Sequence, residues 1–369
     1  MKVSYSYLSE QFTDPDPILN DIKSLIRSGE FTLGKHLEEF EQNFATLCHT
    51  KFAIGVASGT DALRLSLIAF GIGVGDEVIT TPSTFFATIG AIVTVGARPV
   101  YVDVKEDYTL DPDLIEKTIT PKTKAILPVH WHGCPAEMEK ISQLARKHNL
   151  TVIEDACMAI GAEINGKRTG SFGDAGCFSL HPLKPINVWG DGGVITTNSE
   201  QLRDKLLLLR NHGLKNRDEC LFYAYNSRLD PLQAIVGLHL MKEVDWIINR
   251  KIHHANRYDQ ALAKISEITI PPRTPGVKHV YHNYVIMAER RDELYRYLRE
   301  REIDCKIHYP LPQHLQQASQ YLGYQTGDFM VAEEQARKII SLPVHQHLTP
   351  EQIEYVIETI TTFYHYILP

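Results

Sequence analysis

Short apolar runs and helical patterns alternate through the middle of the chain, from about Lys51 to Asn198. The runs are rich in β-branched residues, and polar or Gly/Pro residues open the helical patterns between them, such as Asp61–Phe70 and Cys134–His148. This alternation is typical of βαβ units stacked into a mainly parallel sheet. It predicts seven strands: Phe52–Ala57, Glu77–Thr80, Arg98–Val102, Ala125–Val129, Val152–Glu154, Ala175–Ser179 and Gly193–Thr197.

A smaller unit is predicted after this region. A long helical pattern from Ser227 to about Ala263 leads to it, with apolar positions at three-to-four spacing, and a Pro-rich connector follows at Ile268–Pro275. The remaining patterns are a strand at Tyr281–Met287, a helix at Arg291–Glu300, a strand at Cys305–His308, and helices at Val331–Ile340 and Pro350–Ile367. We therefore expect an α/β protein with a large domain over residues 1–245, which includes an N-terminal arm, and a small α+β domain over residues 246–369.

Charge and apolar content exclude several classes of partner. The 38 Lys and Arg against 45 Asp and Glu give a formal net charge of −7, and neither sign forms a block that could follow a phosphate backbone. No window reaches the roughly 18 apolar residues of a membrane span, and no apolar stretch follows a basic N-terminus. We expect a cytoplasmic protein with neither a nucleic acid nor a membrane partner.

Cysteine and histidine spacing does not suggest a metal site. The six cysteines are scattered without a CxxC pair, and the 17 histidines include no HExxH spacing. We predict neither a disulfide framework nor a bound metal.

Three motifs follow predicted strands, and each has a functional and a structural interpretation. Ser58-Gly59-Thr60 opens a helix after the first strand, so it is either an anion-binding turn or a plain helix cap. The pair Glu154-Asp155 ends the fifth strand, where a carboxylate could bind a cation, act as a base, pair with a protonated ring nitrogen, or cap a helix.

The third motif is a loop that presents one lysine. Lys184 follows the strand that ends at Ser179 and precedes Gly190-Asp191-Gly192-Gly193. A solvated surface lysine is the default interpretation. A lysine held among rigid neighbours at a sheet edge could instead form a Schiff base with a carbonyl cofactor.

Taken together and in this order, the three motifs supply what pyridoxal 5′-phosphate (PLP) needs. They offer a phosphate cup, a carboxylate for the pyridine nitrogen and a lysine for the aldehyde. The segment Pro82–Thr88 adds an aromatic face on which the ring can stack.

The ordered set resembles the DegT/StrS-type family of PLP-dependent sugar aminotransferases, which have fold type I. The resemblance extends from Leu33-Gly34 to Ser341-Leu342-Pro343. The motifs that carry it are Ser-Gly-Thr-Asp-Ala-Leu from Ser58, Thr-Phe-Phe-Ala-Thr from Thr84, Glu-Asp-Ala from Glu154, the Lys184 loop, Asn226-Ser227-Arg228-Leu229-Asp230 and His308-Tyr309-Pro310.

The resemblance implies roles for single residues. Lys184 would form the Schiff base and Asp155 would pair with the pyridine nitrogen. The other implied contacts are phosphate binding by Ser58, Gly59, Thr60 and Ser179, ring stacking by Phe85, a phosphate contact from the neighbouring subunit by Asn226, and substrate contacts by Arg228, His308 and Tyr309. Met158 departs from the family pattern, because Gln or His usually stands there beside the phenolate oxygen and a thioether is a feeble acceptor and no donor.

The implied activity is transfer of an amino group, with glutamate as the donor and a nucleotide-linked keto-sugar as the acceptor. The Asn-Ser-Arg-Leu-Asp motif looks more like the branch that aminates carbon 3 than the branch that aminates carbon 4. Two alternatives remain at this point. One is a sugar dehydratase on the same fold, in which a histidine replaces the lysine; His181 is nearby, but Lys184 occupies the motif position. The other is a catalytically silent regulatory or scaffold protein. The resemblance also implies a homodimer with shared active sites.

Overall fold

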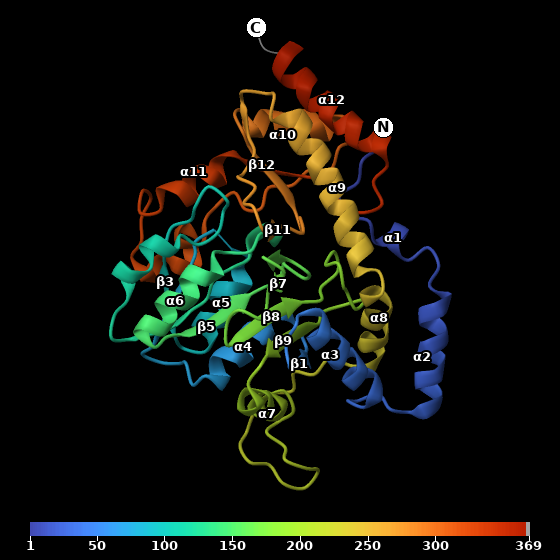
Figure 1. The fold of residues 1–369 in the computed structure, drawn as a ribbon, viewed down its shortest axis with the longest axis vertical. Coiled ribbons are helices and arrows are strands. Elements are labelled where there is room, and N and C mark those ends of the chain that lie inside the picture. The colour runs from blue at the N-terminus through green and yellow to red at the C-terminus, as the bar shows by residue number, and fades with distance from the viewer. Residues whose placement is uncertain (367–369) are drawn as a thin grey trace.

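A seven-stranded sheet lies at the centre of the structure, a computed structural model that describes residues 1–366 (Figure 1). Within that range the strand order is β1-β9-β8-β5-β4-β2-β3, and β9 alone runs antiparallel to its neighbours. The strands are β1 Phe52–Val56, β2 Glu77–Thr80, β3 Arg98–Tyr101, β4 Thr123–Ile126, β5 Thr151–Asp155, β8 Ala175–Ser179 and β9 Gly193–Thr197. The predicted mainly parallel sheet and its seven strands are confirmed.

Helices cover both faces of this sheet because successive strand residues point to opposite sides. On β5, Ile153 packs with residues of α4, α5 and α7, whereas the adjacent Val152 packs with residues of α6. Phe178 of β8 packs with residues of α3 and α8. These helices are α3 Lys35–Leu47, α4 Gly59–Ala69, α5 Phe86–Thr94, α6 Met138–His148, α7 Glu200–Leu209 and α8 Pro231–Met241. Helix α6 begins later than predicted, beyond Pro135.

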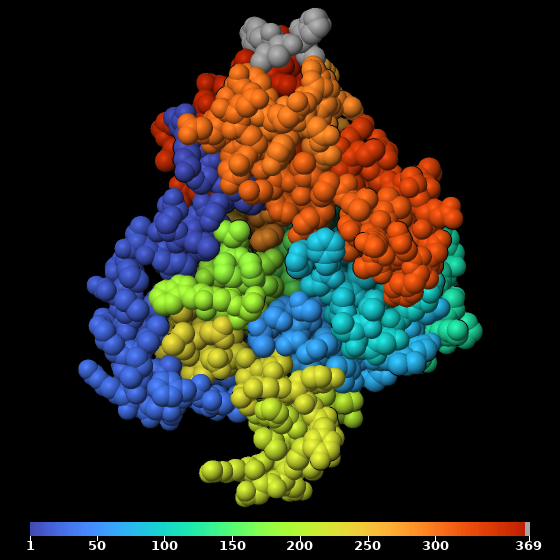
Figure 2. All heavy atoms as spheres, turned by 180° about the vertical axis from the view of Figure 1, so that it is seen from behind, coloured from blue at the N-terminus to red at the C-terminus, as the bar shows by residue number. Residues whose placement is uncertain are grey.

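The N-terminal arm contains two helices that the pattern did not identify, α1 Leu8–Gln11 and α2 Asp16–Ser28. Helix α2 buries Leu25 against Val236 of α8. Ahead of α1 the chain reaches the C-terminal unit, where Val3 pairs with Ile303. Figure 2 shows this N-terminal segment in blue along one edge of the molecule, from the lower part up to the orange C-terminal unit.

The C-terminal unit is built on an antiparallel sheet with the order β10-β12-β13, at the top of Figure 1. Its core joins aromatic and aliphatic side chains such as Tyr258, Tyr284 and Leu298. Its elements are α9 Val244–Leu262, β10 Ile268–Thr269, β12 Tyr284–Ala288, α10 Arg291–Glu300, α11 Met330–Lys338, β13 Ile339–Leu342 and α12 Pro350–Tyr366. A small sheet of β6 Glu163–Ile164, β7 Lys167–Arg168 and β11 Val277–Lys278 lies apart from it. The proposed domain boundary after residue 245 remains a prediction.

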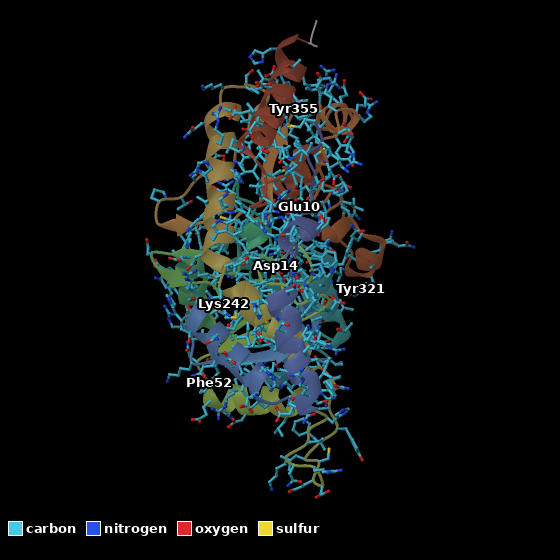
Figure 3. The ribbon with its side chains drawn as sticks, turned by 90° about the vertical axis from the view of Figure 1, so that its right-hand side faces the viewer. Glu10, Asp14, Phe52, Lys242, Tyr321 and Tyr355 are labelled. Atoms are coloured by element: carbon cyan, nitrogen blue, oxygen red, sulfur yellow. The ribbon has the colours of Figure 1, made fainter. Side chains whose placement is uncertain are left out.

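The long helix predicted from Ser227 to Ala263 is wrong, because the structure has two helices there. Pro231 occupies the first turn of α8 and Asp230 caps it, which sets the start. The helices then separate at Lys242, labelled in Figure 3. Helix α8 buries its apolar side in the core of the large unit, whereas Tyr258 of α9 packs in the core of the C-terminal unit. A break between the two helices lets each pack against its own core.

Other differences concern the C-terminal segments. The predicted helix Val331–Ile340 ends at Lys338, because the apolar run from Ile339 forms β13 and pairs with β12. The predicted strand Cys305–His308 is reduced to one bridge between Lys306 and Ser341. Pro310 follows closely and has no N–H to extend such a ladder. Ile367, the last residue of the predicted closing helix, lies outside the described residues.

No helix within residues 1–366 is long and apolar enough to span a membrane. In the same part of the chain, no three or more His, Cys, Asp or Glu residues are arranged as a metal site.

Candidate active site

A cavity of about 360 Å³ lies at the carboxyl ends of β1, β5 and β8, where open α/β sheets place ligands. The C-terminal unit contributes to its wall through residues around His308. Ten residues singled out in the sequence line this cavity: Ser58, Gly59, Thr60, Phe85, Asp155, Met158, Ser179, Lys184, His308 and Tyr309.

One end of the cavity is the start of α4. The Ser58 hydroxyl accepts a hydrogen bond from the Asp61 N–H at 3.0 Å, so Ser58 does cap the helix. The neighbouring glycine is required by packing, since a Cβ on Gly59 would lie 2.8 Å from the Cβ of Ser179. A Cβ on Gly193 would lie 2.3 Å from the Ser58 carbonyl oxygen. These close approaches bring the strand ends together around a helix N-terminus, a favourable place for an anion.

Asp155 lies on the floor of the cavity as the last residue of β5. Its carboxylate accepts hydrogen bonds from the Thr88 hydroxyl at 2.7 Å and the Cys157 N–H at 3.2 Å. The residue is 5% exposed, and no Lys, Arg or His among residues 1–366 forms an ion pair with it. A buried carboxylate without a cation fits a protonated group supplied by a ligand. Thr88 was not assigned a role from the sequence, although it ends the aromatic motif.

Glu154, the other acid of the pair, points away from the cavity. Its carboxylate lies 2.8 Å from His130 Nε2 and accepts hydrogen bonds from the N–H groups of Gly170, Phe172 and Gly173 at 2.7 to 2.8 Å. The structure therefore separates the two carboxylates. Glu154 fastens the loop before β8, and Asp155 faces the cavity.

Lys184 is almost fully buried in the cavity wall, 9% exposed. Its Nζ lies 3.5 Å from Nε2 of His282, and it forms no ion pair with any described residue. Burial lowers the pKa of Lys184, against the opposing influence of Cys157 and Asp155. The preceding residue, Leu183, has φ +74°, and the Tyr7 hydroxyl donates to its carbonyl at 2.9 Å. The loop thus holds an amine whose neutral, nucleophilic form is favoured by its surroundings.

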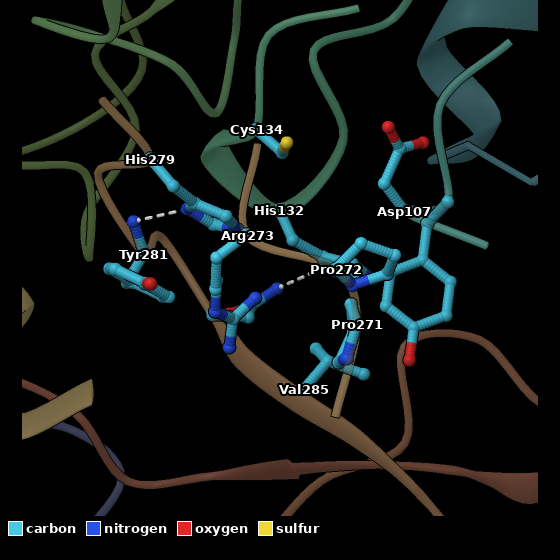
Figure 4. A pocket seen from close by; sticks show the side chains of 11 residues that line it. Asp107, His132, Cys134, Pro271, Pro272, Arg273, His279, Tyr281 and Val285 are labelled. Carbon is cyan, nitrogen blue, oxygen red and sulfur yellow. Dashed lines mark hydrogen bonds between the residues drawn. The ribbon is translucent and has the colours of Figure 1, made fainter. Parts of the chain in front are cut away.

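His282 and Asn283 complete this side of the cavity, and sequence reasoning did not identify them. Burial lowers the pKa of His282 well below its usual range, so the ring is neutral. Asn283 accepts from the Tyr5 hydroxyl at 2.7 Å, and its amide nitrogen lies 3.2 Å from Nδ1 of His132. His132 and Asn283 also line a second cavity, shown in Figure 4, whose volume of about 10 Å³ leaves no room for a substrate. His282 and Asn283 directly precede β12, in a segment with no recognisable sequence motif.

Aromatic rings form the opposite wall. The Tyr309 ring lies 6.0 Å from that of Phe85 and 5.8 Å from that of Trp131, measured between centroids. His308 is held by Ser341 of β13, with 2.9 Å between Nδ1 and the hydroxyl oxygen, and burial lowers its pKa to about 4. The wall is therefore apolar and uncharged, and a planar ring can pack against it.

Asn226 and Arg228 do not line the cavity of their own chain. They lie on the segment between α7 and α8, which extends from the bottom of the molecule in Figures 1 and 2. Asn226 is exposed and forms a bridge with Asn211, whose side-chain oxygen accepts from Arg228 Nη1 at 2.7 Å.

The residues of the cavity fit PLP. A helix N-terminus cradled by glycines suits the phosphate, the unpaired Asp155 carboxylate suits a pyridinium, and the unpaired Lys184 amine suits an aldehyde. A cavity of about 360 Å³ is in the usual range for a cofactor site.

Comparisons with known proteins agree with this geometry. A model described as the DegT/DnrJ/EryC1/StrS aminotransferase family matches residues 14–361. The chain is 41% identical to a pleiotropic regulatory protein of Geobacillus stearothermophilus, over 99% of both chains. It is also 41% identical to the dTDP-3-amino-3,4,6-trideoxy-alpha-D-glucose transaminase of Streptomyces venezuelae, over 92% of this chain and 90% of that protein.

Structural comparison points to the same group. The crystal structure of S. venezuelae DesV superposes with a TM-score of 0.96 at 38% identity, covering 99% of both chains. Other similar structures were solved with the cofactor in its PLP or pyridoxamine form. The chain therefore belongs to the DegT/DnrJ/EryC1/StrS family, and it is a PLP-dependent aminotransferase of amino-sugar biosynthesis with fold type I.

Proposed function

We propose that this enzyme moves the amino group of an amino acid, glutamate, to carbon 3 of a nucleotide-linked keto-sugar. Three relatives at 40 to 41% identity carry names that specify 3-amino or 3-dehydro nucleotide sugars. The Asn-Ser-Arg-Leu-Asp motif from Asn226 supports the same position. One observation carries the proposal. Lys184 and Asp155 line the same cavity, both are buried, and neither has an ion-pair partner among the described residues.

We assign each cofactor contact to a part of the cavity. The N-terminus of α4, with Ser58, Gly59, Thr60 and Ser179, would hold the phosphate. Asp155 would keep the pyridine nitrogen protonated, and Thr88 orients this carboxylate through the 2.7 Å hydrogen bond. Phe85 would pack on the ring. Met158 would stand beside the phenolate oxygen and, as a thioether, would donate no hydrogen bond to it.

The reaction uses Lys184 twice. PLP, when bound, supplies an aldehyde that condenses with amines and a ring that accepts the electron pair of an adjacent carbon. Lys184 would hold the cofactor through its amine. When free, the Nζ amine would take a proton from the substrate carbon and return it on the other side of the transferred nitrogen. The neutral His282 ring, 3.5 Å from Nζ, can accept a hydrogen bond from this amine and keep it directed into the cavity.

We propose a homodimer in which each site receives residues from the partner. Asn226 would contact the phosphate of the partner's site, and Arg228 would join His308 and Tyr309 in binding the sugar substrate. Exposed apolar side chains on the same extending segment support an interface there: Leu221 is 51% exposed and Tyr223 is fully exposed.

The test combines chemical trapping with a substrate panel. Borohydride reduction of the PLP-loaded protein followed by peptide mapping should place the pyridoxyl group on Lys184. The purified enzyme should then aminate nucleotide 3-keto-sugars with glutamate more efficiently than with glutamine, and more efficiently than it aminates 4-keto-sugars. Label on another lysine would contradict the site, a preference for 4-keto-sugars would contradict the carbon assignment, and absence of a cofactor absorbance band would favour a regulatory protein.

A further inference from the structure

Lys251 is a buried cation that the proposed chemistry does not use. It lies on α9, is 1% exposed, and forms no hydrogen bond or ion pair with any residue from 1 to 366. Its Nζ lies 5.6 Å from the centroid of the Tyr7 ring. An ammonium group is seldom buried without a counter-charge, because desolvation is expensive. The described residues supply no negative group beside Lys251.

A space for that group exists. Lys251 lines a cavity of about 70 Å³, which we call the Lys251 cavity, well above the roughly 10–15 Å³ that is enough to hold one water. Tyr5, Tyr7 and His345 line it as well, and neither Asp nor Glu is among the described residues of its wall. Nε2 of His345 donates to the Ser4 carbonyl oxygen at 3.1 Å, so Nδ1 of this neutral ring is an acceptor. The positive charge and the donors that the cavity offers are those of the Lys251 ammonium.

The Lys251 cavity adjoins the active site. Leu183, His282 and His308 line both cavities. His282 connects them most directly, since its Nε2 lies 3.5 Å from Lys184 Nζ while its buried Nδ1 has no partner. A ligand whose nitrogen takes the place of the Lys184 amine would therefore have a substituent within reach of the Lys251 cavity.

We propose that the Lys251 cavity binds a carboxylate of the amino-acid donor, with Lys251 as the counter-charge. This rests on the proposed function, because it requires that the reacting amine be at Lys184. An amino acid brings a carboxylate close to its reacting nitrogen, whereas the sugar ring of the acceptor brings hydroxyl groups. The cavity thus distinguishes the two substrates that share the active site in turn: the donor's carboxylate pairs with Lys251 in the first half-reaction, and water replaces it in the second.

The test compares the two half-reactions in Lys251→Met and a control. Methionine is unbranched like lysine, is one atom shorter, and carries no charge. Lys264→Met removes an exposed lysine just beyond the end of the same helix. With PLP-loaded protein, the loss of cofactor absorbance is followed against glutamate, glutamine and alanine, and separately against the nucleotide-linked amino-sugar product.

We expect Lys251→Met to raise the half-saturating glutamate concentration at least about tenfold, the scale of a lost charge-assisted hydrogen bond. The half-saturating concentration of the amino-sugar should stay within about threefold of the wild-type value. Lys264→Met should match the wild type with glutamate and with the amino-sugar. An equal effect on alanine and glutamate would assign the cavity to the α-carboxylate. An effect on glutamate alone would assign it to the side-chain carboxylate, and either result supports the proposal.

Binding of glutarate, an unreactive dicarboxylate, gives a readout without turnover. Calorimetry should show at least about tenfold weaker glutarate binding by Lys251→Met, and the less bulky change Lys251→Gln should behave alike. Unchanged glutamate and glutarate affinities in the variants would overturn the proposal, as would an equal loss in both half-reactions. If the wild type reacts with no amino acid, the proposed function itself fails and this inference falls with it.

Discussion

The Lys251→Met substitution should stabilise the protein, and more so at low pH. Burial, reinforced by the charge of Lys184, lowers the pKa of Lys251 from 10.5 to about 7. The pKa of Lys251 is lower in the folded state, so between pH 7 and pH 10.5 the unfolded chain binds more protons than the folded one. The stability of the wild type therefore rises with pH over this range. Below pH 7 both states carry the charge, and the folded state bears its full burial penalty.

The magnitude follows from the shift. A difference of about 3.5 pKa units corresponds to about 5 kcal/mol at pH 6, and linkage reduces this to about 2 kcal/mol at pH 9. At about 2.1 cal/mol/K per residue, a chain of 369 residues has an unfolding entropy of about 0.8 kcal/mol/K. The stability advantage of the variant thus falls by about 3 kcal/mol between pH 6 and pH 9. We therefore expect the Tm of the variant minus the Tm of the wild type to shrink by about 4 °C over the same range.

Scanning fluorimetry of both proteins in the same cofactor state measures this difference. Groups that are not coupled to Lys251 are common to both proteins, so the difference reports Lys251 together with its electrostatic coupling to Lys184, His282 and His345. The Lys264→Met control should differ from wild type by an amount that does not vary with pH. A Tm difference for Lys251→Met that stays constant from pH 6 to pH 9, or a wild type that is the more stable at pH 6, would refute the burial argument.

Three further predictions concern the cofactor contacts. Asp155→Asn should retain PLP absorbance but lose at least about 100-fold in turnover, about 2.7 kcal/mol, because an amide does not keep the pyridine nitrogen protonated; steady-state activity within about threefold of wild type would contradict this. Met158→Gln should shift the pH at which the cofactor's visible absorbance changes, since a donor is restored beside the phenolate oxygen, and an unchanged titration would mean that Met158 lies away from it. Mixing inactive Lys184→Ala and Asn226→Asp protomers should restore activity toward half per mixed dimer, whereas sites built from a single chain would leave the mixture inactive.

Residues on contiguous motifs could be predicted from the sequence, whereas residues brought in by tertiary packing could not. Lys184 and Asp155 each follow a strand and sit in motifs that have a direct chemical interpretation. His282 enters the cavity from a segment before β12 that has no motif, and Lys251 lies on the buried side of a helix, where a lysine leaves no distinctive pattern. The sequence also offered no means to separate the roles of Glu154 and Asp155, because side-chain direction at a strand end depends on the register of the sheet.

The fold likewise has elements that the local sequence predicts and others that only tertiary packing decides. Strands of the central sheet can be predicted because burial on both faces makes them continuous apolar runs. The strand β13 was merged with the helix before it, because the apolar residues from Ile339 continue the pattern of α11 without a Gly or Pro between them. Only the pairing with β12 decides where the helix stops.

The N-terminal segment gives the start of the chain an unusual influence over the reaction centre. Within its first seven residues, Val3 pairs with Ile303, the Tyr5 hydroxyl donates to Asn283 at 2.7 Å, and the Tyr7 hydroxyl supports Leu183. Terminal residues are commonly the part of a protein that tolerates trimming or fusion best. In this enzyme, trimming to Leu8 would remove two phenol groups from the wall of the Lys251 cavity and the hydrogen bond that supports the loop before the reactive amine. A version of the enzyme shortened at its N-terminus is therefore expected to have an altered donor preference.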